Sequence, residues 1–171
     1  MPKITKITIF TVLFFILGVF YLSLTRETNY NTSNLISKEV PEFKIIYFND
    51  SNYFTNQDLK KNKYTLINFW ASWCYPCKIE HPILIKLSKE NKLKMVGVNF
   101  KDKSDQALQF LDSLSNPYDI LLKDTKGKQS VNFGIYGIPE SILVNEKSTI
   151  IKKFVGPLSI DDYREIKKVI N

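Results

Sequence analysis

The sequence predicts an α/β domain, an open sheet covered by helices on both faces, preceded by one N-terminal transmembrane helix. Three observations support this prediction. An uncharged apolar run lies near the N-terminus, and after residue 40 short apolar runs alternate with runs of helical periodicity. The length of 171 residues is enough for one domain and some additional chain. Strands that alternate with helices are typical of sheets that are buried on both faces.

The uncharged run Ile7–Thr25 predicts a transmembrane anchor over residues 7–25. A helix of this length would reach about 28 Å, close to the ~30 Å hydrocarbon core of a bilayer. Lys3 and Lys6 precede the run, so the positive-inside rule places residues 1–6 in the cytoplasm and the remainder outside. A cleaved signal peptide is the alternative, but only Ser23-Leu24-Thr25 approximates a cleavage site. We therefore expect a retained anchor.

A polar linker is predicted over residues 26–39, which are rich in Asn, Thr and Ser. The folded domain is predicted over residues 40–171, a usual size for one domain. The net charge is +7, but the lysines are scattered along the chain. Nucleic-acid binding proteins concentrate basic residues on one element, so we expect no nucleic-acid partner.

Short runs rich in β-branched and aromatic residues predict strands at 43–48, 64–70 and 94–100. Runs with apolar residues at helical spacing predict helices from the cysteine pair to about residue 89, at 104–114 and at 159–170. Ser104 and Ser159 are the expected N-caps of the last two helices, and Ile160 is expected on the apolar face of the last one. A short apolar run spans 118–122, a turn is expected at 124–127, and a hairpin is expected at 140–144 and 150–155.

Cys74 and Cys77 are the only cysteines, and they lie where the second predicted strand gives way to a helix. Two sulfurs at this spacing can close a small disulfide ring and open it again. A thiol attacks a disulfide as its thiolate, which the amides and dipole of a helix N-terminus stabilise. Pro76 suits the first helical turn, where its missing N–H costs nothing. We therefore assign Cys74 as the nucleophile and Cys77 as the resolving thiol.

Two other interpretations of the cysteine pair are possible. An inert local disulfide would constrain the unfolded chain little, because the loop is so small. A structural zinc site usually has four ligands, whereas this chain offers two cysteines and one histidine, His81. We expect no metal and no other cofactor, and we interpret His81 as an ordinary helix residue.

The run Phe69–Cys77 resembles the active-site motif of the thioredoxin superfamily, and Pro82 matches its helix-kinking proline. Further runs resemble the CcmG/DsbE family and its near relatives ResA and TlpA: 40–43, 78–82, 97–102, 116–118 and 134–140. The resemblance implies a thioredoxin-like fold with a central mixed sheet. It also implies a thiol–disulfide oxidoreductase anchored by a single span in the inner membrane, with its C-terminal domain facing the periplasm. Such a protein reduces the haem-attachment cysteines of apocytochrome c, or another haem-maturation thiol protein, with electrons from a transmembrane thiol reductant.

The resemblance also assigns residues to substrate binding. Pro139 would be a cis-proline facing the cysteines, since cis peptide bonds are essentially a proline property. Ile138 would offer backbone hydrogen bonds to a bound peptide. Trp73 would shield the cysteine site and contact the substrate.

Glu80 and Glu140 match acidic residues that the family places near its active site, where a carboxylate can move protons during exchange. Asn68 stands where ordinary thioredoxins carry a buried aspartate. We therefore expect Glu80 to take over the role of proton acceptor. By spacing alone, Glu80 could instead be a solvent-facing helix residue.

Three other functions compete with reduction. A general periplasmic disulfide oxidase or isomerase would use the same chemistry at a different reduction potential. A peroxidase would need a peroxidatic cysteine in its own pocket, and we find no such motif. A metal-binding chaperone would usually add a methionine or histidine cluster, whereas the chain has two Met and one His.

Overall fold

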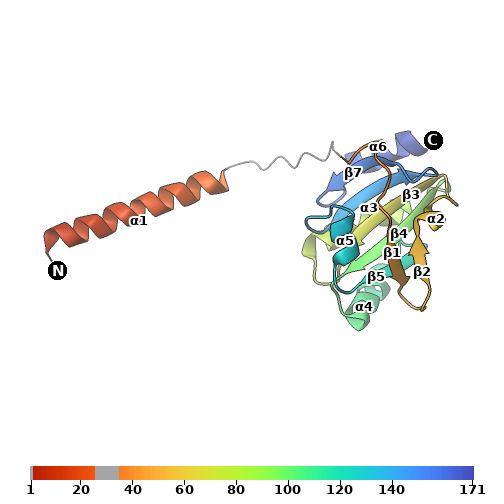
Figure 1. The fold of residues 1–171 in the computed structure, drawn as a ribbon, viewed down its shortest axis with the longest axis horizontal. Helices are drawn as coiled ribbons and strands as arrows, with labels where there is room; N and C mark the ends of the chain where they lie inside the picture. The colour runs from red at the N-terminus through yellow and green to blue at the C-terminus, as the bar shows by residue number, and fades with distance from the viewer. Residues whose placement is uncertain (1, 26–34) are drawn as a thin grey trace. The chain divides into compact units, whose positions relative to one another are not determined.

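The computed structural model describes residues 2–25 and 35–171, in two units that we treat separately. The first unit is helix α1, Lys3–Leu24 (Figure 1). None of its residues is buried. Its 22 residues correspond to about 33 Å, so α1 is long and apolar enough to span a membrane. The helix begins before the predicted apolar run, because Lys3 and Lys6 continue the helical backbone ahead of the uncharged stretch.

The second unit is built on one sheet of seven strands in the order β2-β1-β5-β4-β3-β6-β7. The strands are β1 (Lys44–Tyr47), β2 (Tyr53–Thr55), β3 (Tyr64–Trp70), β4 (Leu93–Phe100), β5 (Ile120–Asp124), β6 (Glu140–Asn145) and β7 (Ile150–Val155). Strand β4 runs parallel to both β3 and β5, and the other pairs are antiparallel. The sheet is therefore mixed, and the expected hairpin is β6–β7.

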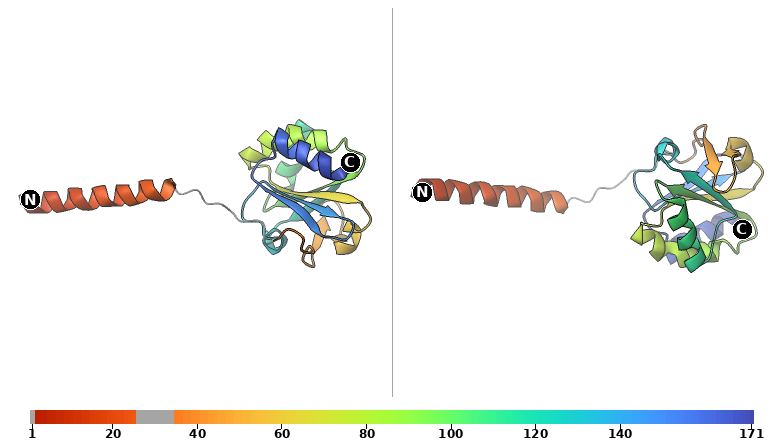
Figure 2. Two further views of the ribbon diagram at one scale, coloured as in Figure 1. Left: turned by 90° about the horizontal axis from the view of Figure 1, so that it is seen from above. Right: turned by 90° about the horizontal axis from the view of Figure 1, so that it is seen from below.

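Helices cover both faces of this sheet (Figure 2). They are α2 (Asn56–Leu59), α3 (Tyr75–Leu87), α4 (Ser104–Leu114), α5 (Lys128–Asn132) and α6 (Ile160–Ile170). Apolar side chains of α3, α4 and α6 pack into the cluster on one face, and Leu59 of α2 packs into the cluster on the other. The sequence-based prediction of an α/β sheet covered on both faces is confirmed.

Strand β3 lies in the middle of the domain and contributes to both clusters in alternation. Leu66 and Trp70 belong to the cluster that also contains both cysteines, whereas Ile67 and Phe69 belong to the other. This is the period of two expected of a strand buried on both faces. The end of β3, from which the cysteine loop leaves, is therefore anchored from both sides.

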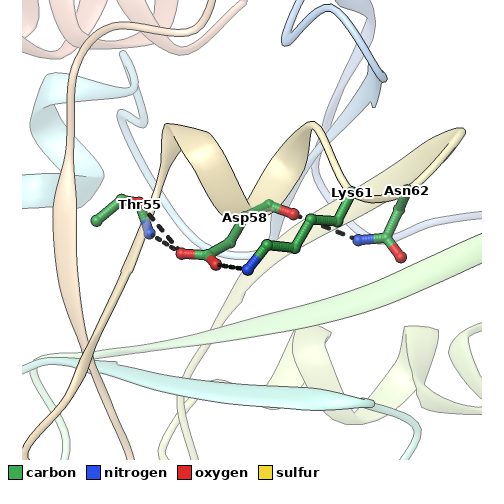
Figure 3. A network of polar contacts seen from close by, with 4 residues as sticks. All are labelled: Thr55, Asp58, Lys61 and Asn62. Atoms are coloured by element: carbon green, nitrogen blue, oxygen red, sulfur yellow. Dashed lines mark hydrogen bonds and ion pairs between the residues drawn. The ribbon is translucent and has the colours of Figure 1, made fainter.

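The short helix α2 was not predicted, although the sequence carries its start signal (Figure 3). The Asp58 carboxylate accepts the backbone N–H of Thr55 at 2.9 Å and its hydroxyl at 3.1 Å, as in a capping box. Lys61 pairs with Asp58 at 2.7 Å, and Asn62 donates to the Asp58 carbonyl at 3.4 Å. These contacts stabilise a helix of one turn, which is too short to show apolar periodicity in the sequence.

Several predicted boundaries differ from the structure. Helix α4 begins at Ser104 itself, so the N-cap is Lys103 and the cap prediction for Ser104 was wrong. Ser159 does cap α6, and its hydroxyl accepts the Asp162 N–H. Ile160 is 41% exposed, because the first turn of α6 extends beyond the packed face.

The linker predicted at 26–39 lies partly outside the described residues, which leave out 26–34. Residues 35–39 contact the domain. The Ser37 N–H donates to the Ile150 carbonyl at 2.8 Å, and Glu39 forms a β-bridge with Thr149. Among the described residues, contacts with the hairpin therefore begin before residue 40.

Candidate active site

Cys74 and Cys77 form a disulfide at the start of α3, with an S–S distance of 2.02 Å and a Cα–Cα distance of 5.3 Å. Cys74 occupies the N-cap position of α3, four residues after β3 ends at Trp70. Cys74 is 5% exposed and Cys77 is 2% exposed. The local order of strand, short loop and helix thus places the first sulfur at a helix N-terminus, where the sequence predicted it.

The N-terminus of α3 supplies a donor to the Cys74 sulfur. The backbone N–H of Cys77 points at Cys74 Sγ, with an N···S distance of 3.2 Å. Pro76 lies in the first turn, where no intrahelical partner for an N–H exists. When the disulfide is reduced, this amide and the helix dipole favour the thiolate of Cys74.

Asp102, just beyond the end of β4, holds the loop that leads to the cysteines. Its carboxylate accepts the Ser72 N–H at 2.6 Å and the Ser72 hydroxyl at 2.8 Å. It also accepts the Asn99 side-chain N–H at 2.9 Å and the Lys103 N–H at 2.8 Å. Our sequence reasoning did not single out Asp102. Its only signal was a place at the end of the run 97–102, which resembles the CcmG/DsbE family.

Trp73 lies in the same loop, next to Cys74, and is 58% exposed. Its indole N–H donates to the Lys101 carbonyl at 3.3 Å, which turns the ring toward the β4 end of the loop. The backbone of Lys101 has a φ of 45°. The indole therefore presents an apolar surface to solvent beside the nucleophile position.

The Ile138–Pro139 peptide bond is cis, as the family resemblance implied. Register pairs Phe69 of β3 with Glu140 of β6, so Pro139 lies beside the end of β3 where the cysteine loop begins. Ile138 packs against both apolar clusters, one of which contains the two cysteines. The fold thus brings residues 138–139 and 74–77 to the same end of the sheet.

Glu80 lies on α3, one turn beyond Cys77, and is fully buried. Its carboxylate accepts the Asn68 side-chain N–H and the Leu158 backbone N–H, each at 2.8 Å. Burial raises the pKa of the Glu80 carboxyl from 4.5 to about 7, while these two hydrogen bonds act in the opposite direction and the charge of Asp162 adds to the rise. The alternative of a solvent-facing Glu80 is wrong, because α3 packs this face against β3 and the segment before α6.

Glu140 is 2% exposed and lies at the start of β6. One carboxylate oxygen accepts the N–H groups of Tyr136 and Gly137, both at 3.0 Å. The other pairs with the Lys153 ammonium at 2.8 Å. Lys153 is itself buried and donates to the Gly134 carbonyl at 2.5 Å. Our sequence reasoning missed Lys153, because a lysine in a strand ordinarily points to solvent.

His81 is buried rather than exposed, and its Nε2 lies 2.7 Å from the Ser115 carbonyl oxygen. Phe110 meets its ring edge-on at a centroid distance of 5.7 Å. Within residues 2–25 and 35–171, no group of three His, Cys, Asp or Glu side chains is arranged to hold a metal ion. His81 therefore belongs to the packing between α3 and the end of α4.

Comparison with known proteins gives consistent matches. The redoxin family model matches residues 36–170. The thiol:disulfide interchange protein CycY of Rhizobium leguminosarum is 52% identical over 57% of this chain, a match that spans about half (52%) of that relative. HelX of Rhodobacter capsulatus, also a thiol:disulfide interchange protein, is 38% identical over 79% of this chain and 76% of its own length.

A structural comparison agrees on the fold. The thioredoxin domain of a thiol–disulfide oxidoreductase from Bacteroides vulgatus superposes with a TM-score of 0.67 at 23% identity. That match covers 80% of this chain and 98% of the other. The fold is therefore thioredoxin-like, and the chain belongs to the redoxin family, among its thiol:disulfide interchange proteins, which are thiol–disulfide oxidoreductases.

Proposed function

We propose that this chain is a membrane-anchored reductant of protein disulfides, in which Cys74 attacks and Cys77 resolves. The observation that carries the proposal is the place of Cys74 at the N-cap of α3, with the Cys77 amide directed at its sulfur. This donor stabilises a thiolate at Cys74 more than at Cys77, which lies inside the first turn. The more exposed of the two residues is thus also the better nucleophile at neutral pH.

The cycle starts from the reduced pair. The Cys74 thiolate attacks one sulfur of the partner's disulfide, forms a mixed disulfide and displaces the partner's other sulfur as a thiolate. The Cys77 thiol loses its proton and attacks Cys74 Sγ, which releases the second partner sulfur. Two electrons pass to the partner, the partner's sulfurs take up two protons, and the chain ends with the Cys74–Cys77 disulfide.

For Glu80 we propose the role of proton acceptor for Cys77. It is three residues further along α3, so the two side chains share a helix face. A carboxyl with a pKa of about 7 can take a proton and return it near neutral pH. Ordinary thioredoxins use a buried aspartate as proton acceptor at the place where this chain has the neutral amide of Asn68, and Glu80 would take over that role.

The contacts of Glu140 favour a role in holding the loop rather than in proton transfer. Its carboxylate pairs with Lys153 and accepts the N–H groups of Tyr136 and Gly137, which ties the loop to β7. The loop that Glu140 holds ends at Ile138 and Pro139, for which we propose contacts with the backbone of a bound peptide. Trp73, which directly precedes Cys74 and is exposed, would cover the substrate's disulfide.

The substrate class we propose is apocytochrome c, with its haem-attachment cysteines, or another haem-maturation thiol protein. The motif resemblance to the CcmG/DsbE family supports this choice. We further propose that a transmembrane thiol reductant returns electrons to the Cys74–Cys77 disulfide. A general oxidase or isomerase of the periplasm is the alternative, and a reduction potential close to ~−120 mV would favour it.

We propose that α1 is a single span in the inner membrane, with residues 1–6 in the cytoplasm and the domain in the periplasm. Lys3 and Lys6 at the start of α1 support this orientation. Thiol–disulfide exchange suits this location, because disulfides form and persist outside the cytoplasm.

Trapping tests the proposal. In the full chain, Cys77→Ser removes the resolving sulfur, so the mixed disulfide at Cys74 accumulates and its partners can be identified by mass spectrometry. We expect apocytochrome c among them. The matched control Cys74→Ser leaves only the less exposed Cys77 sulfur, without the N-cap donor, and should capture far less. Capture of unrelated secreted proteins alone would contradict the substrate proposal, and equal capture by both variants would contradict the assignment of the nucleophile.

A further inference from the structure

A buried phenol lies two hydrogen bonds away from Glu80. The Tyr118 hydroxyl donates to the side-chain oxygen of Asn68 at 2.6 Å, and Tyr118 precedes β5, on the other side of β4 from β3. Trp70 stacks on its ring at a centroid distance of 5.7 Å. On its other flank lies Gly97, where an added Cβ would meet the ring at 2.6 Å. The ring is therefore confined to one position, and its hydroxyl meets Asn68.

Asn68 uses every polar atom of its side-chain amide. Its oxygen accepts from Tyr118, and its nitrogen donates to Glu80 at 2.8 Å and to the Ser141 hydroxyl at 3.0 Å. All four residues lie inside the domain. The amide could present the same shape after a half-turn, but then its oxygen would face Glu80. Only one of the two orientations is compatible with a carboxylate at Glu80.

We propose that Tyr118 is a positioning residue, which donates its hydroxyl hydrogen to Asn68, keeps the amide nitrogen turned toward Glu80 and so favours the ionised carboxylate. In the half-turned orientation the Tyr118 hydroxyl hydrogen would have no acceptor. Without the hydroxyl, that cost of turning the amide disappears. Its oxygen then accepts a hydrogen from protonated Glu80 but repels the carboxylate. A buried hydroxyl or carbonyl without a hydrogen-bond partner costs free energy. The bond from Tyr118 therefore shifts the equilibrium between the two Asn68 amide orientations by about the free energy of one hydrogen bond.

Other groups also act on Glu80, and they stay in place when Tyr118 is changed. The Leu158 N–H, ahead of α6, donates to the second carboxylate oxygen. Asp162 of α6 adds a negative charge that disfavours ionisation. Cys77 lies one turn earlier on α3 itself, and Ser141 of β6 contacts the same amide. Tyr118 is therefore one of several groups that act on the ionisation of Glu80, and its effect favours the ionised carboxylate.

The test follows the Glu80 carboxyl directly. We would titrate the full chain in detergent micelles and record the carboxyl ¹³C shift of Glu80, assigned by its disappearance in Glu80→Gln. In Tyr118→Phe the midpoint should rise by about 0.5–1 pH unit, because one hydrogen bond worth roughly 1 kcal/mol supports the ionised form. The matched control is Tyr163→Phe, which removes a phenol hydroxyl that donates to Glu90 at 2.8 Å and should leave the midpoint unchanged.

A second pair of variants tests the route through Asn68. In an Asn68→Ala background, Tyr118→Phe should produce no further shift of the Glu80 midpoint. An unchanged midpoint in Tyr118→Phe, or a shift of equal size in the Asn68→Ala background, would overturn the inference.

The functional consequence of this inference depends on the proposed proton role of Glu80, and the two can be separated. The pH profile of the exchange rate is recorded on the same proteins. If the carboxyl midpoint moves but the rate profile does not, the positioning role of Tyr118 stands and the proton role of Glu80 fails. If the midpoint does not move, the positioning role fails whatever the rate profile shows.

Discussion

Glu80 keeps a carboxyl group inside the domain, where ionisation costs more free energy than in water. Hydrogen bonds from Asn68 and Leu158 offset part of that cost and leave the pKa at about 7. If Glu80 has the proton role proposed above, the domain must accommodate its charged form at neutral pH, and the redox chemistry is then coupled to folding stability.

The first prediction concerns the pH dependence of stability. Between pH 4.5 and 7 the folded protein retains the Glu80 proton that the unfolded chain releases, because the folded pKa is about 7 and the ordinary value is 4.5. The stabilisation is fully present below pH 4.5 and is lost as the pH rises through 7. This loss amounts to about 3 kcal/mol. In Glu80→Gln, the part of the pH dependence due to this group should disappear.

Urea unfolding of both proteins between pH 4 and 8 measures this difference. The wild-type free energy of unfolding should fall relative to that of Glu80→Gln as the pH rises. Parallel curves for the two proteins would show that Glu80 titrates alike in the folded and unfolded states. The same variant also tests its chemistry, because an unchanged Cys74 thiolate titration and exchange rate would refute the proton role.

The second prediction concerns Asp102, whose carboxylate accepts hydrogen bonds from Ser72 in the cysteine loop and from Asn99 and Lys103 at and beyond the end of β4. Asp102→Ala should lower the free energy of unfolding by about 1–3 kcal/mol, because partly buried donors lose their acceptor. It should also slow thiol–disulfide exchange at Cys74, since the loop from Ser72 is no longer fixed. Asp112→Ala, on the exposed face of α4, is the control and should change neither quantity. Unfolding curves measure the stability of the two variants, and stopped-flow measures their exchange rates. The same stability and the same rate in Asp102→Ala and Asp112→Ala would contradict the role given to Asp102.

At the scale of elements, the hairpin β6–β7 is organised around a buried ion pair. Lys153 of β7 and Glu140 of β6 meet at 2.8 Å with side chains that are 0% and 2% exposed. The pair connects the edge of the sheet to the loop that carries the cis-proline. A buried charge whose partner is removed is strongly destabilising, whereas a surface pair contributes little.

The third prediction follows from that contrast. Lys153→Met should lower the free energy of unfolding by about 3–5 kcal/mol, because Glu140 is left buried without its counter-ion. Lys152→Met is the matched control on the same strand. Its pair with Glu165 is partly exposed, so its loss should cost less than about 1 kcal/mol.

The double variant Lys153→Met/Glu140→Gln completes this experiment. It should be less destabilised than Lys153→Met alone, since no uncompensated charge remains. Denaturant unfolding measures all three variants. Equal losses for Lys152→Met and Lys153→Met would argue against a buried ion pair in solution.

The elements also show what could be predicted from sequence. Periodicity located β3, α3, β4, α4, the hairpin and α6, because each has an apolar face longer than a turn. It missed β2, α2 and α5, which have three to five residues and are fixed by local polar bonds such as the capping box at Thr55. The spacing of the cysteines indicated the redox pair, and motif resemblance indicated the cis-proline and Glu80. The resembling runs 97–102 and 116–118 contain Asp102 and Tyr118 but assigned neither a role, and no pattern marked Lys153. The partners of these three residues are fixed by strand register and loop contacts.

At the scale of the whole molecule, one apolar helix and one redox domain are joined in a single chain. Helix α1 has no buried residue among those described, and its length suits a bilayer. The domain has its own two apolar clusters. We therefore attribute to α1 the role of membrane anchoring and to the domain the thiol–disulfide chemistry.

The fourth prediction concerns orientation. In a Cys74→Ser/Cys77→Ser background, a new cysteine at Lys3 should react with a membrane-impermeant maleimide only after the membrane is opened. A cysteine at Asn171, at the end of the domain, should react in cells whose inner membrane is intact. Labelling followed by gel shift measures both, and the reverse pattern would place the domain in the cytoplasm.

The amide of Cys77 already faces the Cys74 sulfur while that sulfur is oxidised. Reduction then adds negative charge to an acceptor whose donor is in place, so little of the surrounding backbone has to rearrange between the two states. We therefore expect the approach of a partner's disulfide to the N-terminus of α3, rather than rearrangement of this backbone, to set the rate of the proposed exchange.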